Sequence, residues 1–181
     1  MIKDTTVLAF DFGASGGRAV KAVFNKEKFS YKEVHRFENN PIEQNGHLCW
    51  DFNQLMEHIY MAIEKAESVD SIGFDTWGVD YGLLDKNGAL IHLPVHYRDN
   101  RTKGILNEVQ QKISTQKLYT ATGNQIMSIN TLFQLLAEEK DVLNKAKTLL
   151  FMPDLFAYML SGKKVCELSI SSTSQMLNPQ T

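Results

Sequence analysis

The stretch "AFDFGASGGRAV", residues 9–20, decides the fold, because it places a glycine-rich turn between two apolar runs. Within seven positions it holds an acid, a hydroxyl and three glycines, and Arg18 follows directly. A tight hairpin turn needs only one or two glycines. The additional glycines favour a backbone that reaches positive φ and turns bare N–H groups toward a small anion.

The segments around this turn predict strands. Residues 5–13 and 18–25 are rich in β-forming residues, and residues 29–39 alternate between apolar and polar positions. The turn therefore joins two consecutive strands of a three-stranded meander. A Rossmann fingerprint would open a helix at this point, and a P-loop would continue with Lys and Ser or Thr. Neither motif applies, because a strand follows.

The rest of the chain predicts helices that alternate with strands. A helix begins after Asp51 as N-cap, with apolar residues at helical spacing: Phe52, Leu55, Met56, Ile59, Ile63 and Ala66. The further predictions are a strand over 71–78, a hairpin at Asn87-Gly88, mainly helix over 99–144, a strand over 148–152 and a helix from Pro153 to the residue before Gly162. For the Ser/Thr-rich residues 169–181 we expect no closing helix or strand. This order predicts a mixed α/β sheet with helices on its faces.

Composition limits the class of protein. The 181 residues are 43% hydrophobic and 22% charged, as in ordinary globular domains, and the net charge of −2 argues against a nucleic-acid partner. The two cysteines, Cys49 and Cys166, lie too far apart for a zinc or disulfide pattern. The first ten residues match neither a signal peptide nor a membrane span. We expect a cytoplasmic protein without a membrane or nucleic-acid partner.

The glycine turn is a candidate phosphate site. Its N–H groups, the Ser15 hydroxyl and the Arg18 charge would all attract an anion. Asp11 would face a phosphate only through Mg²⁺ and its waters, because magnesium combines one or two carboxylates with water and phosphate oxygens. From these residues alone, an ordinary hairpin with an Asx-type turn remains the alternative.

Two further clusters bear polar side chains. Asp75, Thr76, Trp77, Gly78 and Asp80 lie at the end of a strand whose other residues are predicted to be buried, and strand ends of α/β sheets are where ligands bind. An indole beside a glycine and two acids suits a sugar, although a core tryptophan with solvated acids is the alternative. The cluster "HYRDNRT", residues 96–102, holds two arginines and an acid. Its alternative is an N-cap at Asp99 with Arg98 and Arg101 as surface charges.

Taken together, "DFGASGGR", "IGFDTWGVDYGLLD" and "PVHYRDNRT" resemble the amino-terminal domain of the FGGY carbohydrate kinases. "NTLFQL" and "MPDLFAYMLSG" add a likeness to the rhamnulokinase subfamily, and the resemblance covers nearly the whole chain. It implies an actin-like (ribonuclease-H-like) α/β fold of two domains, with ATP and a ketose meeting in the cleft between them. It also implies transfer of the γ-phosphoryl group to the 1-hydroxyl of L-rhamnulose.

The resemblance implies a role for individual residues. Ala14, Ser15, Gly16, Gly17 and Arg18 would line the ATP phosphates, Asp11 would support Mg²⁺, and Gly78 would touch the sugar beside Trp77 and Asp80. At position 16 the family varies between Ser and Gly, so Gly16 loses one possible hydroxyl contact. The family's catalytic base and adenine pocket belong to segments beyond Thr181. Residues 1–181 are therefore expected to form most of a first domain that lacks its second domain and is inactive alone.

Several alternatives remain open from sequence. The kinase could act on another ketose of the family, since one methyl group changes discrimination only modestly. The chain could be a sugar-binding module without catalysis. A ribonuclease-H-like nuclease could hold two metals with Asp11, Asp75 and Asp80, but the slightly acidic charge disfavours it.

Overall fold

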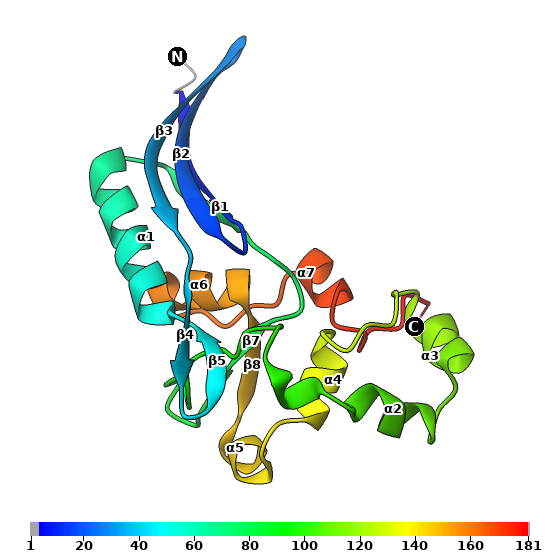
Figure 1. Cartoon of the computed structure of the whole chain (residues 1–181). Coiled ribbons are helices and arrows are strands. Elements are labelled where there is room, and N and C mark those ends of the chain that lie inside the picture. The colour runs from blue at the N-terminus through cyan, green and yellow to red at the C-terminus, as the bar shows by residue number, and fades with distance from the viewer. Residues whose placement is uncertain (1–3, 181) are drawn as a thin grey trace. The chain divides into compact units, whose positions relative to one another are not determined.

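The computed structural model describes residues 4–180, which form two units (Figure 1). The first unit contains the residues up to Asn40 together with Asp51–Trp77. The second contains Pro41–Trp50 together with the residues from Gly78 onward. None of the helices in the described part of the chain is long and apolar enough to cross a membrane.

The first unit is built on a four-stranded mixed sheet in the order β3-β2-β1-β6, of which Figure 1 labels β1, β2 and β3. Its strands are β1 (Thr5–Phe12), β2 (Gly16–Asn25), β3 (Lys28–Glu38) and β6 (Ser71–Asp75). β1 runs antiparallel to β2 and parallel to β6. The predicted meander is confirmed, and the glycine turn joins two consecutive strands.

One face of this sheet is covered by α1 (Phe52–Ala66), which contacts β3 and β2. The Asp51 carboxylate caps the helix by accepting a hydrogen bond from the Gln54 N–H at 3.1 Å, as predicted. The buried helix residues are Phe52, Leu55, Met56, Ile59, Ala62 and Ala66, so Ala62 takes the place expected for Ile63. Leu8, Phe10 and Phe12 of β1 are buried, and the alternate residue Asp11 is exposed on the other face.

The second unit contains two short antiparallel strand pairs. β4 (Pro41–Gln44) pairs with β5 (His47–Trp50), and β7 (Tyr81–Leu84) pairs with β8 (Thr148–Phe151). The β4–β5 hairpin was not predicted. The segment predicted as mainly helical divides into η1 (Asn100–Thr102), α2 (Ile105–Gln110), α3 (Thr115–Thr122), α4 (Thr131–Leu136) and α5 (Lys140–Lys145).

In the second unit two further predictions are confirmed and one is wrong. α6 (Met152–Ser161) ends at Gly162, whose φ of +69° suits glycine, as predicted. The predicted hairpin at Asn87-Gly88 is confirmed: the Asp85 N–H donates to the Ala89 carbonyl at 2.9 Å and the Ile91 N–H to the Leu83 carbonyl at 3.0 Å, around an antiparallel Leu84–Leu90 bridge. β7 also pairs with β8. The expectation of no closing helix is wrong, because α7 (Leu168–Ser172) forms under a cap from Glu167.

Candidate functional site

The turn between β1 and β2 is held in one conformation by hydrogen bonds. The Gly13 N–H donates to the Gly16 carbonyl at 2.8 Å. Asn39, which is buried, donates its Nδ2 to the Gly13 carbonyl at 3.0 Å and its N–H to the Ser15 carbonyl at 3.3 Å. The N–H groups of Ala14 and Ser15 make no hydrogen bond to another residue that the structure describes. These two donors remain accessible to a ligand.

The glycines of the turn are required by close packing. None of Gly13, Gly16 and Gly17 has a positive φ, so the expectation of a left-handed backbone is wrong. A Cβ on Gly16 would lie 3.0 Å from the Phe37 carbonyl oxygen, and a Cβ on Gly17 would lie 2.3 Å from the Phe37 Cζ. The turn therefore needs glycine because β3 approaches its backbone so closely.

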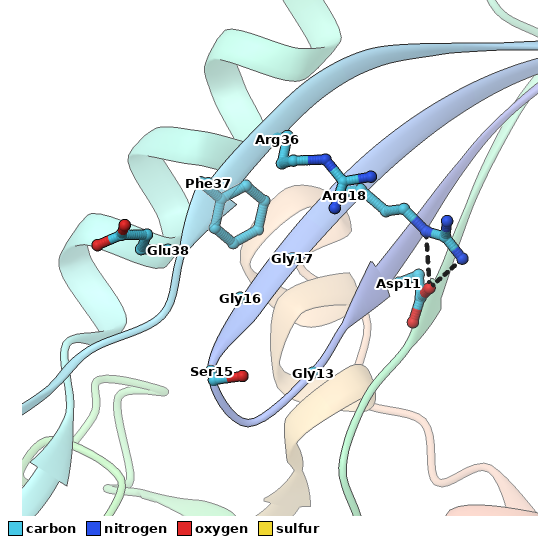
Figure 2. Close-up of a pocket in the computed structure, with 9 residues that line it drawn as sticks. All are labelled: Asp11, Gly13, Ser15, Gly16, Gly17, Arg18, Arg36, Phe37 and Glu38. Carbon is cyan, nitrogen blue, oxygen red and sulfur yellow. Dashed lines mark hydrogen bonds and ion pairs between the residues drawn. The ribbon is translucent and has the colours of Figure 1, made fainter.

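A cavity of about 580 Å³ lies beside this turn (Figure 2). Its lining residues are Asp11, Gly13, Ser15, Gly16, Gly17, Arg18, Arg36, Phe37 and Glu38. The structure thus brings together the predicted phosphate residues except Ala14, which is not in the lining. Arg36, Phe37 and Glu38 were not predicted; they come from β3, and only the pairing of β3 with β2 reveals them.

Charged side chains occupy paired positions across the whole sheet. Arg36 of β3 pairs with Arg18 of β2, Arg18 with Asp11 of β1, and Asp11 with Asp75 of β6. We call these four residues the charged row. The Arg18 Nε and NH2 each lie 2.9 Å from the Asp11 Oδ2, and both side chains are about half exposed. Such an exposed ion pair is weak, so a ligand can rearrange it.

The backbone at Val79, next to Gly78, is strained. Val79 has a φ of +70°, which is costly for a β-branched residue. Its N–H donates to the Thr173 Oγ1 at 3.2 Å, and its carbonyl accepts from the Thr131 Oγ1 at 2.7 Å. A Cβ on Gly78 would lie 3.0 Å from the Thr173 Oγ1. Strain that the surroundings maintain is typical of ligand sites.

A cavity of about 540 Å³ in the second unit adjoins this strained backbone. Its lining residues are Gly78, Val79, Tyr97, Gly123, Asn124, Gln125, Met127, Ile129, Asn130 and Thr173. Amides, a hydroxyl and a phenol offer both donors and acceptors, which suits a ligand rich in hydroxyl groups. Of the residues predicted for the sugar, Gly78 is in this lining, whereas Trp77 and Asp80 are not.

Asp80 lies behind the lining of this cavity and is only 1% exposed. Its carboxylate accepts hydrogen bonds from the Trp50 Nε1 and the Gln134 Nε2, both at 2.7 Å, and from the Tyr97 N–H at 3.2 Å. Through Tyr97 it connects to the cavity wall. The geometry therefore gives Asp80 a positioning role, and its direct contact with a sugar remains a prediction.

The "HYRDNRT" cluster is largely structural. Asp99 caps η1 by accepting from the Arg101 N–H at 2.9 Å, so the alternative of an N-cap is confirmed. Arg101 is not a surface charge: its side chain is 6% exposed and lies 2.8 Å from Glu138. Arg98 is exposed over the Tyr97 ring.

Comparison with known protein families shows to which family this chain belongs. Residues 6–181 match the model of the "FGGY family of carbohydrate kinases, N-terminal domain". The chain belongs to this family. The nuclease alternative is left without support.

Curated FGGY relatives include the rhamnulokinase of Pectobacterium atrosepticum, 41% identical over 95% of this chain, and that of Bacteroides thetaiotaomicron, 42% identical over 96%. The chain spans only 36% and 37% of the length of these relatives.

Solved structures show the fold. A gluconate kinase from Lactobacillus acidophilus superposes with a TM-score of 0.79 at 18% identity, over 99% of this chain and 38% of its own. A xylulose kinase from Rhodospirillum rubrum gives a TM-score of 0.79 at 14% identity, over 98% of this chain and 38% of its own. The predicted actin-like (ribonuclease-H-like) α/β fold, a mixed sheet with flanking helices, is confirmed.

We expect Asp80→Asn to destabilise the chain. The substituted side chain has one oxygen and one NH₂ group where Asp80 has two oxygens, so its NH₂ group must face either the Gln134 Nε2 or the Trp50 Nε1, which are both donors. A buried donor then has no acceptor, and the free energy of unfolding should fall by about 1–3 kcal/mol. Urea unfolding measures this change. Asp75→Asn removes the same charge from an exposed strand end and serves as the control. If Asp80→Asn unfolds like this control, Asp80 does not position the cavity wall.

We expect the stability of the chain to depend on His96 in mild acid. His96 is 3% exposed, stacks on Trp50 at 3.9 Å and accepts the Arg98 N–H at its Nδ1. Burial, with the nearby Arg98 charge, lowers its pKa from 6.5 to about 4. The unfolded chain therefore binds this proton more tightly, and stability is lost as the pH falls from about 6.5 toward about 4. In His96→Gln the difference in Tm between pH 7 and pH 5 should shrink; an unchanged difference would contradict this role.

Proposed function

We propose that the chain is the amino-terminal domain of an ATP-dependent kinase that converts L-rhamnulose to L-rhamnulose 1-phosphate. The observation that carries this proposal is the cavity beside the glycine turn, which Ser15, Gly16, Gly17 and Arg18 line. The rhamnulokinase relatives support the choice of ketose. Kinases for other ketoses, and a sugar-binding module without catalysis, remain the alternatives.

The turn would hold the ATP phosphates. The N–H groups of Ala14 and Ser15 are not hydrogen-bonded within the described residues, Gly16 and Gly17 line the cavity with their backbone, and Arg18 adds a charge. Backbone N–H groups with one arginine are an effective cradle for phosphate oxygens.

Asp11 would support Mg²⁺ from its place at the end of β1. In the described residues no group of three or more potential ligands converges, so an all-protein metal cage is absent. One exposed carboxylate, with Asp75 at the paired position, fits an ion that keeps most of its waters. When bound, the ion would neutralise charge on the transferring phosphoryl group.

The ketose would bind in the cavity that adjoins Gly78. The close contact of Gly78 with Thr173 leaves room only for hydrogen at this position. Trp77, which precedes Gly78 in the chain, keeps its predicted sugar contact as part of this proposal, and Asp80 would act by holding Tyr97 and Gln134. This assignment keeps Gly78, Trp77 and Asp80, the three residues predicted from the sequence, in the sugar site, but Asp80 would act on the sugar only indirectly.

The catalytic base, the adenine pocket and the second domain would belong to segments beyond Thr181. Phosphoryl transfer requires both substrates in line and a placed base, and an open half-site leaves water beside the γ-phosphate. In this proposal the enzyme acts in the cytoplasm.

We expect residues 1–181 alone to transfer no phosphate. Loss of the base costs roughly 10²–10⁴ in rate, and loss of the second domain removes most of the nucleotide contacts as well. ADP release with L-rhamnulose should equal the uncatalysed background, and calorimetry should detect weak ATP binding or none. Extending the chain through a second domain should restore both ADP release with L-rhamnulose and ATP binding. Turnover by residues 1–181 that disappears in Asp11→Ala would place the base within this chain.

A further inference from the structure

Arg36 lies in the phosphate cavity although no sequence motif marks it. It comes from β3, and its paired position on β2 is Arg18. Both arginines line the cavity beside the turn. Figure 2 shows the Arg36 side chain extending across β2 toward Arg18, whereas the Glu38 carboxylate points away from both. The cavity thus has two guanidinium groups on one wall.

This arrangement is unfavourable without an anion. Directly opposite residues on antiparallel strands have Cβ atoms about 5 Å apart, and like charges there destabilise the sheet. In this structure each arginine is balanced by a separate acid: Arg18 contacts Asp11, and Arg36 contacts Glu33. Both ion pairs are exposed, so both are weak and easily exchanged for a ligand.

The Arg36–Glu33 pair has the geometry of a displaceable contact. The Arg36 Nε lies 2.9 Å from the Glu33 Oε1, and its NH2 lies 2.5 Å from the Oε2. This bidentate pairing uses the donors that would otherwise bind two oxygens of a phosphate. The Arg36 guanidinium also keeps the pKa of Glu33 below its ordinary value.

We propose that Arg36 is a second arginine of the phosphate site. Arg36 breaks its ion pair with Glu33 and, together with Arg18, binds the polyphosphate tail of the nucleotide. The proposal rests on the phosphate role proposed for the turn. Glu33 competes with the ligand for Arg36 and thereby weakens binding. The occupant is a polyphosphate because two guanidinium groups at paired positions match an extended chain of anionic groups better than one phosphate.

The test uses the ¹⁵N-labelled 181-residue chain and inorganic tripolyphosphate, titrated in 0.15 M salt and followed by the amide signals of Gly16 and Gly17. Arg36→Gln should raise the Kd about two- to fivefold, as expected for an exposed charge contact. Lys32→Gln is the matched control: it removes the same charge from β3 at about 13 Å along the strand, beyond the screening length of about 8 Å. It should leave the Kd near the wild-type value.

A double-mutant cycle tests the competition with Glu33. Glu33→Gln should lower the Kd for tripolyphosphate, because Arg36 is no longer paired with Glu33. This decrease in Kd should vanish when Arg36→Gln is also present, because there is then no Arg36 side chain to release. Equal effects of Lys32→Gln and Arg36→Gln, or a gain from Glu33→Gln that persists without Arg36, would overturn the role of Arg36. If the Gly16 and Gly17 signals shift while Arg36→Gln binds tripolyphosphate with the wild-type Kd, the phosphate role of the turn is supported and the proposed role of Arg36 is contradicted. Amide signals report binding that is too weak for calorimetry to detect, so if these signals do not shift even at saturating tripolyphosphate, the phosphate role of the turn fails together with that of Arg36.

Discussion

The close approach of β3 to the glycine turn is the contact on which the first unit depends. Phe37 lies where side chains on Gly16 and Gly17 would be, and Asn39 at the end of the strand hydrogen-bonds the turn from the same side. The Phe37 ring in turn packs on Phe12, with ring centroids 5.4 Å apart, and on His58 of α1 at 4.5 Å. The helix, the core and the cavity beside the turn therefore meet at one aromatic side chain.

This contact also separates the two faces of the sheet. On the covered face, Phe10, Phe12 and Phe37 form the core against α1. On the exposed face, the charged row runs from two arginines on β3 and β2 to two aspartates on β1 and β6. Successive side chains along each strand point to opposite faces of the sheet, which puts all four charged residues on the exposed face, and strand pairing brings them next to one another. Under the proposed function, a magnesium–polyphosphate would present the complementary charges, with phosphate oxygens facing the arginines and the cation facing the acids.

The parts of the fold set by local patterns were predictable. The alternating strands, the helix capped by Asp51 and the turn between β1 and β2 all follow from spacing within a few residues. The turn residues of the candidate site were found for the same reason. The helical segment over 99–144 was less predictable, because left-handed residues at Gly104 and Gly123 interrupt it.

Features set by distant contacts were not predictable from one sequence. Arg36 joins the cavity only through the pairing of β3 with β2. The burial of Asp80 depends on Trp50 and Gln134, which lie 30 and 54 residues away in the chain. The need for glycine at positions 16 and 17 comes from Phe37, so the positive φ inferred from the sequence as its reason was wrong.

The most direct measurement is of Gly16→Val kinetics in a two-domain protein that begins with this chain. Gly73→Val is the matched control, because a Cβ at Gly73 on β6 meets no atom within 4 Å. A side chain at Gly16 would press on the Phe37 carbonyl and displace the turn, so kcat/KM for ATP should fall about 100-fold or more, while the KM for the ketose changes little. The control should keep both constants. If kcat and the KM for ATP of Gly16→Val stay near wild type, the turn does not hold the phosphates.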